Sequence, residues 1–389
     1  MALRTLHAPQ ARTGLVSHPR ITLIRRAGIS GRKVRVNCTA GLLTAASARP
    51  SDHPTSRNFP LRSLSYDELN VETPIAYELY QGALARWSHS DGAAVPPTAV
   101  MVHGILGNRR NMSSFAKMLV EGFPGWQVLL VDLRCHGESA ALPTRPHGPH
   151  GVAAAAGDVL ALLRRLRLFP HVLIGHSFGG KVVMSMVQQF PQRLPRPVQV
   201  WVLDSLPGRV RSGGGGPDGR DHPGDLIELL RGIPMPVASR SEVIDRVVRA
   251  GFTPGIAQWV VTNLRPVEEL SGAAQGRSGA GSSNSSGLSW TFDLDGIAQL
   301  YRSYEETQLW DLIKQPPQGL KLNFVKAERS TFRWGGPDEA AITTAGHGVH
   351  LLPASGHWVH ADNPLGLYDI LAPSFGGGSD LKMWRTQRR

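Results

Sequence analysis

The sequence predicts an α/β protein in which helices cover both faces of a mostly parallel β-sheet. Three features of the chain carry this prediction. Short apolar runs alternate with amphipathic stretches of helical period between residues 98 and 204. Each of these runs is apolar throughout, as in strands buried on both faces. A long stretch of helical period then interrupts the alternation, which resumes near residue 320.

The individual elements follow from the periodicity of apolar residues. Residues 75–87 are predicted to form a hairpin that turns at Gly82. Buried strands are predicted at 98–103, 127–132, 171–175, 198–204, 320–325 and 350–353. Helices are predicted at 111–122, 151–168, 179–190 and 363–374.

The stretch between residues 205 and 318 is predicted to be a helical lid over the strand ends, inserted after the sixth strand. Its predicted helices are 225–232, 241–250, 254–264 and 295–306. Two segments rich in Gly and Ser, 211–219 and 271–287, interrupt it. We expect both to be flexible, because they cannot bury enough apolar surface to offset the entropy of ordering.

The positive charge of the chain is concentrated at its N-terminus. Residues 1–50 carry nine Lys or Arg and no Asp or Glu, so 12 − 9 leaves a net charge of +3 for residues 51–389. That remainder is too weakly basic to indicate nucleic-acid binding. An Arg-rich, acid-free N-terminus is typical of an organellar transit peptide, with a disordered basic tail as the alternative. Residues 34–40 look like a chloroplast processing region, which favours the plastid over the mitochondrion.

We therefore assign residues 1–60 to a transit peptide and leader, 61–204 and 319–375 to the two parts of a core, 205–318 to the lid, and 376–389 to a basic tail. No apolar run reaches the roughly 18 residues that a membrane-spanning helix needs. Cys38 falls in the predicted leader, which leaves Cys135 alone in the mature chain. We expect neither an internal disulfide nor a cysteine-based metal cluster there. The oligomeric state stays open.

The strongest motif is Gly175-His176-Ser177-Phe178-Gly179. It lies between a predicted strand and a predicted helix, the context that distinguishes a nucleophile elbow from a chance match. The sharp turn places the serine in a strained backbone conformation, and the flanking glycines let neighbouring chain pass without a Cβ clash. The hydroxyl is then exposed near the positive end of the following helix. The motif predicts an α/β-hydrolase fold with Ser177 as nucleophile.

A serine hydroxyl needs a base to remove its proton, and His357 is the candidate. It follows the last short strand and precedes the last helix, which is the place of the base in the chain order serine, acid, histidine. His360 is interpreted as a structural residue before a helix that Asp362 or Asn363 caps. Position 177 is not a carboxylate, which argues against an epoxide or haloalkane hydrolase.

Backbone N–H groups are expected to stabilise the oxyanion of the reaction. One is the N–H of Phe178, directly after the nucleophile. The other comes from the turn that starts at His103, with Ile105 favoured and Leu106 as the alternative. His103 itself is expected to stabilise that turn by hydrogen bonding. Residues 132–139 are interpreted as a structural turn with an internal Asp–Arg network.

Three carboxylates compete for the acid of the triad. Asp204 is favoured, because it ends the strand that follows the nucleophile's own strand and helix and so emerges beside Ser177. Glu328 follows the strand 320–325, the commonest acid position on this fold, but has basic neighbours. Asp295 begins a predicted lid helix, where an N-cap role would explain it.

Four motifs resemble the alpha/beta-hydrolase domain-containing protein 11 family and its bacterial esterase relatives: residues 103–108, 132–139, 175–181 and 356–364. The resemblance covers about residues 70–375, and the leader makes the chain look like a plant or algal organellar member. It implies a serine esterase of acyl substrates that uses neither metal nor cofactor. In the resembling family the strand matching 320–325 ends in a Gly-Asn-like turn, which weighs against Glu328. The Gly/Ser-rich segments depart from the family and leave the substrate pocket open.

The favoured function is therefore hydrolysis of a small-molecule acyl ester, thioester or lipid through an acyl-enzyme. An acyltransferase or a cofactor-free perhydrolase on the same site is the first alternative, because the acyl-enzyme is common to all three. A non-catalytic ligand-binding receptor on a hydrolase fold is the second. Acyl chain length and leaving group are not encoded in any motif.

Overall fold

In the computed structural model, the described residues are 22–24, 34–35, 75–85, 95–141, 149–189, 198–210, 221–274, 287–330 and 334–376. Most of the predicted leader, the first Gly/Ser-rich segment, residues 275–286 of the second and residues 377–389 of the predicted basic tail lie outside them. No helix in these ranges is long and apolar enough to cross a membrane.

A single large sheet runs through the core in the order β11-β10-β7-β6-β4-β5-β3-β1-β2. From β5 to β11 all neighbouring strands are parallel, whereas β3 is antiparallel to β5. This confirms the predicted α/β architecture with a mostly parallel sheet. The strands are β1 (Thr22–Ile24), β2 (Val34–Arg35), β3 (Tyr77–Gln81), β4 (Thr98–Val102), β5 (Gln127–Val131), β6 (Pro170–His176), β7 (Gln199–Leu203), β10 (Lys321–Ala327) and β11 (Gly348–Leu352).

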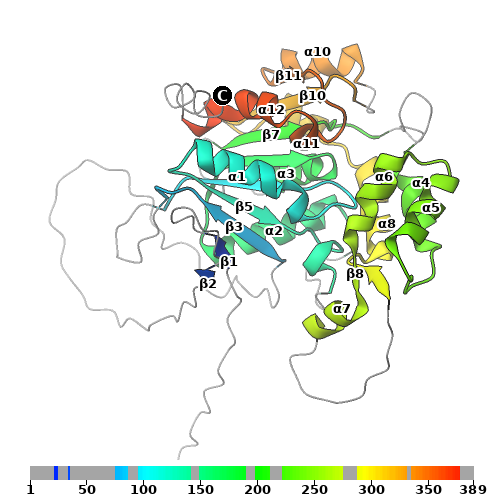
Figure 1. Cartoon of the computed structure of the whole chain (residues 1–389). Coiled ribbons are helices and arrows are strands. Elements are labelled where there is room, and N and C mark those ends of the chain that lie inside the picture. The colour runs from blue at the N-terminus through cyan, green and yellow to red at the C-terminus, as the bar shows by residue number, and fades with distance from the viewer. Residues whose placement is uncertain are drawn as a thin grey trace, which may run out of the picture.

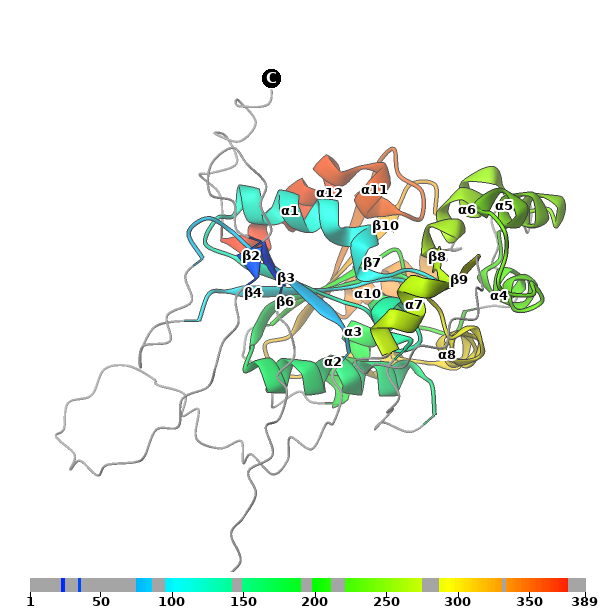
Figure 2. The same ribbon diagram turned by 60° about the horizontal axis from the view of Figure 1, so that its bottom comes forward.

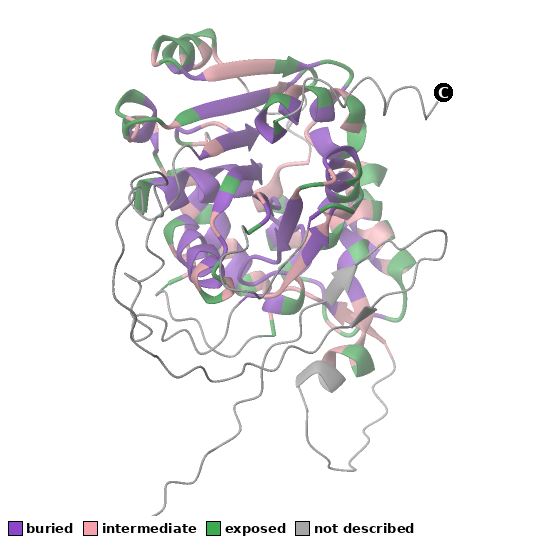
Figure 3. Ribbon diagram, turned by 90° about the vertical axis from the view of Figure 1, so that its left-hand side faces the viewer, coloured by how far each residue is buried: buried purple, intermediate pink, exposed green. Residues whose placement is uncertain are grey.

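Helices form a layer on each face of the sheet (Figure 2). One layer holds α1 (Ser113–Gly122), α11 (Val359–Asp362) and α12 (Pro364–Leu371), and the other holds α2 (Val152–Leu166) and α3 (Phe178–Gln189). Side chains of a strand alternate between the two layers. Ala99 and Met101 of β4 pack with α1 and α12, while Val100 and Val102 pack with α2 and α3. Figure 3 shows the buried strands between these layers.

The elements between β7 and β10 gather at one end of the sheet (Figure 1). We call residues 205–318 the insertion. It contains a small antiparallel ribbon, β8 with β9, among its helices. Its elements are α4 (Pro223–Arg231), α5 (Arg240–Arg249), α6 (Pro254–Val260), the 3-10 helix η5 (Val261–Asn263), β8 (Leu264–Pro266), α7 (Val267–Ala274), β9 (Leu288–Trp290), α8 (Leu294–Glu306) and α9 (Trp310–Lys314).

The predicted hairpin at 75–87 is wrong. Among residues 75–85, the part that the structure describes, only β3 forms, and its antiparallel partner is β5. The backbone N–H of Gly82 donates to the carbonyl of Trp126 after α1. The insertion therefore follows the fifth strand counted from β3, not the sixth. Pairing with a strand fifty residues away cannot be distinguished from a local hairpin by alternation alone.

Three smaller features also differ from the prediction. The strands β1 and β2 extend the sheet edge from within the predicted leader. Residues 271–274 of the segment predicted to be flexible continue α7. The helix α10 (Gly336–Thr344) beside β11 and the β8–β9 ribbon were not predicted. Each of these elements is short and lacks a sustained period, so tertiary contacts decide its structure.

Candidate active site

Ser177 occupies the sharp turn between β6 and α3. Its φ angle of 53° lies in the left-handed region, which is strained for a residue with a side chain. A Cβ at Gly175 would overlap the carbonyl of Gly179, and a Cβ at Gly179 would overlap the carbonyl of Val102. The two glycines therefore permit the turn that the motif predicts.

His357 and Asp204 meet at the same end of the sheet. His357 lies in the loop between β11 and α11, and Asp204 directly follows β7. The Nδ1–H of His357 donates a hydrogen bond of 2.8 Å to Oδ2 of Asp204. Asp204 is fully buried, whereas the His357 side chain is 24% exposed. The pair thus fixes one ring nitrogen against a carboxylate in the interior and leaves the ring edge accessible.

Three further donors hold the Asp204 carboxylate. Its Oδ1 accepts from the Ala327 N–H at 3.2 Å and from the Trp334 indole N–H at 3.4 Å. Its Oδ2 also accepts from the Ser330 hydroxyl at 2.9 Å. Asp204 has a φ angle of 46°, a second left-handed residue at this edge of the sheet. The carboxylate is therefore fully hydrogen-bonded in the interior and has one defined orientation toward His357.

His176 links the turn at Ser177 to the loop of His357. Its Nε2–H donates a 2.7 Å hydrogen bond to the carbonyl oxygen of His357, and the two ring centroids are 4.7 Å apart. On the other side of the turn, a Cβ at Gly104 would come within 3.2 Å of the Ser177 Cβ. The structure therefore gathers Ser177, His357 and Asp204, together with the turn after β4, at the carboxyl end of the sheet.

Two buried histidines lie beneath His357. Burial lowers the pKa of His176 well below its usual range, and the nearby His357 lowers it further. Burial, and to a smaller extent the charge of the nearby His357, lowers the pKa of His360 to about 4. The rings of His176 and His360 are 5.0 Å apart. Both are therefore neutral near pH 7.

Asn363 caps α12 by accepting from the Gly366 N–H at 2.9 Å, as the sequence suggests.

The two alternative acids lie away from His357. Glu328 is exposed, and its Oε2 accepts from the Ala354 N–H at 2.8 Å. Asp295 is exposed and forms an ion pair of 2.7 Å with Arg231. The predicted N-cap role of Asp295 is wrong, because Asp293 caps α8 instead. Of the three candidates, only Asp204 contacts His357 within the described part of the chain.

The turn after β4 presents a backbone N–H beside Ser177. The Leu106 N–H already donates to Nε2 of His136 at 3.1 Å. The Ile105 N–H has no acceptor in the part of the chain that the structure describes. Phe178 begins α3, where the first N–H groups have no acceptor within the helix. Of the two candidate donors in this turn, Ile105 is thus the one available to a bound anion.

Two buried histidines shape this turn. The Nδ1–H of His103 donates to the Gly104 carbonyl at 2.8 Å, and its Nε2 accepts from the Leu133 N–H at 3.0 Å. His136 donates in turn to the carbonyl of Arg134. Burial lowers the pKa of both histidines, so each is neutral and can accept as well as donate. His103 has the turn-stabilising contacts expected of it.

The predicted Asp–Arg network within residues 132–139 is wrong in its pairing. Asp132 pairs with Arg109 after β4, and Arg134 makes a buried two-bond pair with Asp158 of α2 at 2.7 and 2.9 Å. The segment is structural, and its three charged side chains, Asp132, Arg134 and Glu138, are paired with residues of other elements. It ties the turn after β4 and helix α2 to the end of β5.

The insertion contributes a tyrosine to the elbow. The hydroxyl of Tyr304 in α8 lies 3.2 Å from Oγ of Ser205, and its ring centroid is 5.8 Å from that of Phe178. Burial raises the pKa of Tyr304, while hydrogen bonds to Ser205 and Ser177 lower it in part. A neutral phenol of the insertion therefore lies within hydrogen-bonding reach of the Ser177 side chain.

Lys181 of α3 binds the backbone around Tyr304 and lies against its ring. Its ammonium donates to the carbonyl oxygens of Gly208, Tyr304 and Thr307 at 2.7, 2.6 and 2.9 Å. Nζ also lies 4.5 Å from the centroid of the Tyr304 ring. Burial lowers the pKa of Lys181 to about 7. The end of α8 is thus bound to the helix that follows Ser177.

Asn263 makes a second link between the insertion and the core. Its Oδ1 accepts from Nδ2 of Asn108 at 2.6 Å, and its Nδ2 donates to the carbonyl of Leu106 at 3.3 Å. The sequence interpretation gave no role to Asn263 or Tyr304. A helical period marks Tyr304 only as a buried position, and no motif marks Asn263.

The fold and this site define the class of protein. Residues 97–316 match the family model described as alpha/beta hydrolase fold, and the chain belongs to that family. It is similar to the sn-1-specific diacylglycerol lipase ABHD11 of Mus musculus, at 29% identity over 287 residues, 72% of this chain and 81% of the relative. This confirms the family resemblance found in the four sequence motifs.

Two further proteins show the range of relatives. A probable alcohol acetyltransferase of Saccharomyces cerevisiae is 35% identical over 100 residues, 25% of this chain and 27% of that protein. The solved structure of a marine microorganism esterase matches with a TM-score of 0.60 at 20% identity, covering 77% of this chain and 98% of the esterase. The structural match supports the fold alone.

Proposed function

We propose that this chain is a serine hydrolase that cleaves a carboxylic ester or thioester through an acyl-enzyme on Ser177. The observation that carries the proposal is the 2.8 Å hydrogen bond from His357 to the buried Asp204, at the sheet edge where Ser177 occupies a strained turn. This observation supports an arrangement of nucleophile, base and orienting acid of the kind that activates a serine hydroxyl.

The reaction would proceed in two halves. Asp204 holds Nδ1 of His357 as the donor nitrogen, so Nε2 accepts the proton as Ser177 Oγ attacks the carbonyl carbon. The imidazolium then returns this proton to the leaving alcohol or thiol as the tetrahedral intermediate collapses. Water attacks the acyl-enzyme by the same route, which releases the acid and restores the Ser177 hydroxyl.

The negative charge of each intermediate would be stabilised by the N–H groups of Ile105 and Phe178. These donors are backbone groups on two elements that the sheet holds in place, so little reorganisation is needed during the reaction. The contact of His136 with Leu106 N–H keeps the turn in the conformation that presents Ile105. Loss of one such donor costs about 10²–10³ in kcat in a well-studied protease.

A lipid ester is the substrate class that we favour. The similar mouse protein is named a diacylglycerol lipase. Two tryptophans, Trp259 of the insertion and Trp358 beside His357, pack with ring centroids 5.4 Å apart. They offer apolar surface next to the base, where an acyl chain would lie.

The proposal is tested with a fluorophosphonate probe and with nitrophenyl esters of graded acyl length. The wild-type chain should label and should hydrolyse the esters, and Ser177→Ala should do neither while keeping its circular dichroism spectrum. Labelling that persists in Ser177→Ala would show that another residue is the nucleophile. A wild-type chain that is folded but neither labels nor turns over any ester would favour the ligand-binding alternative.

Acyl transfer is a second candidate, because the chain is also similar to a probable alcohol acetyltransferase. The same acyl-enzyme would then be attacked by an alcohol instead of water. Adding short and long alcohols to the ester assay separates the two functions. A transferase forms the new ester in preference to the free acid at alcohol concentrations far below that of water, whereas a hydrolase does not.

A further inference from the structure

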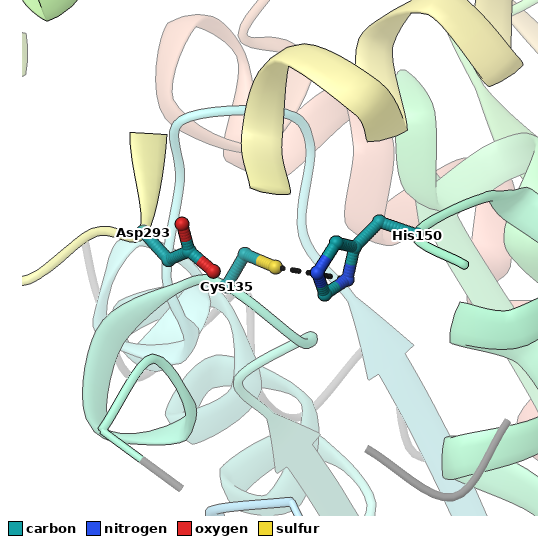
Figure 4. Close-up of side chains that lie close together, drawn as sticks. All are labelled: Cys135, His150 and Asp293. Carbon is teal, nitrogen blue, oxygen red and sulfur yellow. Dashed lines mark hydrogen bonds between the residues drawn. The ribbon is translucent and has the colours of Figure 1, made fainter. Parts of the chain in front are cut away.

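A second group of chemically reactive side chains lies apart from Ser177. Cys135 follows β5, His150 precedes α2, and Asp293 caps α8 of the insertion. One ligand atom from each lies within 4.8 Å of the other two. Figure 4 shows the Cys135 sulfur directed at the His150 ring, with the Asp293 carboxylate on its other side. No step of the proposed ester hydrolysis uses these residues.

We propose that Cys135, His150 and Asp293 form a binding site for a divalent transition-metal ion of the zinc type, which joins the insertion to the core. Thiolate, imidazole and carboxylate are the ligands that Zn²⁺ takes in proteins. A thiolate and a carboxylate also balance the two charges of the ion, so the loaded site is neutral. This matters because Cys135 is fully buried, and an unbalanced charge there would be costly.

The separation of the sulfur and the nitrogen fits such an ion. Cys135 Sγ and His150 Nδ1 are 3.4 Å apart. Bonds of about 2.3 Å to sulfur and about 2.0 Å to nitrogen at a tetrahedral angle place the two atoms about 3.5 Å apart. A fourth ligand would come from solvent, since His150 and Asp293 are only partly buried.

The backbone around the cluster is arranged to bring these side chains together. Cys135 has a φ angle of 67°, a conformation that a side-chain-bearing residue adopts only where its surroundings impose it. Its carbonyl accepts from the Asp293 N–H at 2.9 Å. A Cβ at Gly296 would overlap the Cys135 sulfur and lie 2.7 Å from Oδ2 of Asp293. Glycine at position 296 therefore leaves the space between the thiol and the carboxylate open.

The two carboxylate oxygens of Asp293 have separate tasks. Oδ1 accepts from the Gly296 N–H at 3.0 Å and caps α8. Oδ2 is the oxygen next to the space above Cys135, so it can bind an ion without loss of the cap. A bound ion would connect the end of β5 to the helix that carries Tyr304, and we expect it to stabilise the folded chain by mass action.

The experiment uses the full-length chain, stripped with a chelator and titrated with Co²⁺ and then Zn²⁺. One equivalent of Co²⁺ should give tetrahedral d–d bands and a thiolate-to-cobalt charge-transfer band, and Zn²⁺ should displace it. Zn²⁺ should also raise the Tm of the wild-type chain. A wild-type chain that binds neither ion, or that binds Co²⁺ without the thiolate band, would overturn the proposal.

Variants locate the site. Cys135→Ser should abolish the charge-transfer band and weaken Zn²⁺ binding by more than about 100-fold, beyond the effect of losing a supporting residue. Cys38→Ser, which alters the second cysteine of the chain, is the matched control and should bind as wild type does. His150→Gln, on a partly buried residue, guards against a folding defect in Cys135→Ser and should also weaken binding. Unchanged binding in both site variants would refute the assignment. Ser177→Ala should bind the ion as the wild type does. The metal-site proposal and the hydrolase proposal are therefore tested independently of each other.

Discussion

The two sides of the candidate site are built in different ways. On the core side, Ser177, Asp204 and the turn of Ile105 directly follow strands of one sheet. Each has a residue in the left-handed backbone region, which in the turn is Leu106. On the insertion side, Tyr304 and Asn263 come from a helix and a 3-10 turn that are separated by about forty residues. They reach the site through side-chain hydrogen bonds to Ser205, Asn108 and the Leu106 carbonyl.

This difference suggests a division of tasks. Residues on strand ends cannot move without disturbing the buried sheet, so they suit chemistry that tolerates little displacement. The insertion is joined to the core by polar contacts such as those of Asn263 and by apolar side chains of α8 that pack in the same cluster as α2 and α3, and its Tyr304 and Asn263 do not follow strands of the large sheet. We therefore expect core substitutions to affect kcat by orders of magnitude and insertion substitutions to have modest effects.

Ser177→Ala tests the core side most severely. We expect kcat for a short-chain ester to fall by about 10⁶, the size found when the serine of a well-studied protease triad is removed. The free energy of unfolding should not fall, because the hydroxyl contributes little to packing and the left-handed turn does not depend on it. Steady-state kinetics and urea unfolding measure the two quantities. A loss of less than 100-fold would mean that the core side does not supply the nucleophile.

Asp204→Asn should have the second-largest effect. An amide can still accept a hydrogen bond, but it no longer stabilises the imidazolium and can hold the wrong tautomer of His357, so we expect kcat to fall by about 10⁴. Glu328→Gln is the matched control, because it makes the same chemical change at an exposed residue that contacts the Ala354 N–H. It should stay within about twofold of wild type. The reverse result would assign the acid to Glu328.

The core side could be predicted from sequence, and the reason is local. The elbow is written within five residues between an apolar strand and a helix, and Asp204 is the first polar residue after such a strand. In a parallel sheet, strand ends meet at one edge, so the pattern of strands alone places these residues near one another. The choice of Asp204 over Glu328 matches the contact with His357.

The insertion side could not be predicted, because its contacts join residues that are far apart in the chain. Asn263 meets Asn108 across 155 positions, and Lys181 meets Tyr304 across 123. No period or motif encodes these meetings. For the same reason the sequence does not show that His150 and Asp293 lie beside Cys135, because no motif or spacing relates the three residues.

His360→Phe tests how a buried histidine of the core side affects the stability of the fold at acid pH. The folded pKa of His360 is about 4, below the 6.5 of an exposed histidine. Between these two pH values the unfolded chain binds a proton at residue 360 that the folded chain does not. The contribution of the neutral His360 to the unfolding free energy is therefore fully present above pH 6.5 and is lost as the pH falls toward 4. Phenylalanine does not titrate, so the unfolding free energy of His360→Phe should fall less steeply with falling pH than that of the wild type. The difference in slope should be at most about 1.4 kcal/mol per pH unit. Urea unfolding at pH 7, 6 and 5 measures the slope, and parallel curves for the two proteins would contradict the expectation.

Tyr304→Phe tests the insertion side and should have the smallest effect. The substitution keeps the ring against Phe178 and Lys181 and removes only the hydroxyl that reaches Ser205 and Ser177. One hydrogen bond contributes about 0.5–1.5 kcal/mol, so kcat/KM should fall by roughly two- to tenfold. Tyr301→Phe is the matched control in the same helix, because its hydroxyl faces His222 at 3.5 Å. A drop of 1000-fold in Tyr304→Phe would place this phenol in the chemistry itself and would break the division between the two sides, whereas equal drops in both variants would show that only the packing of α8 was disturbed.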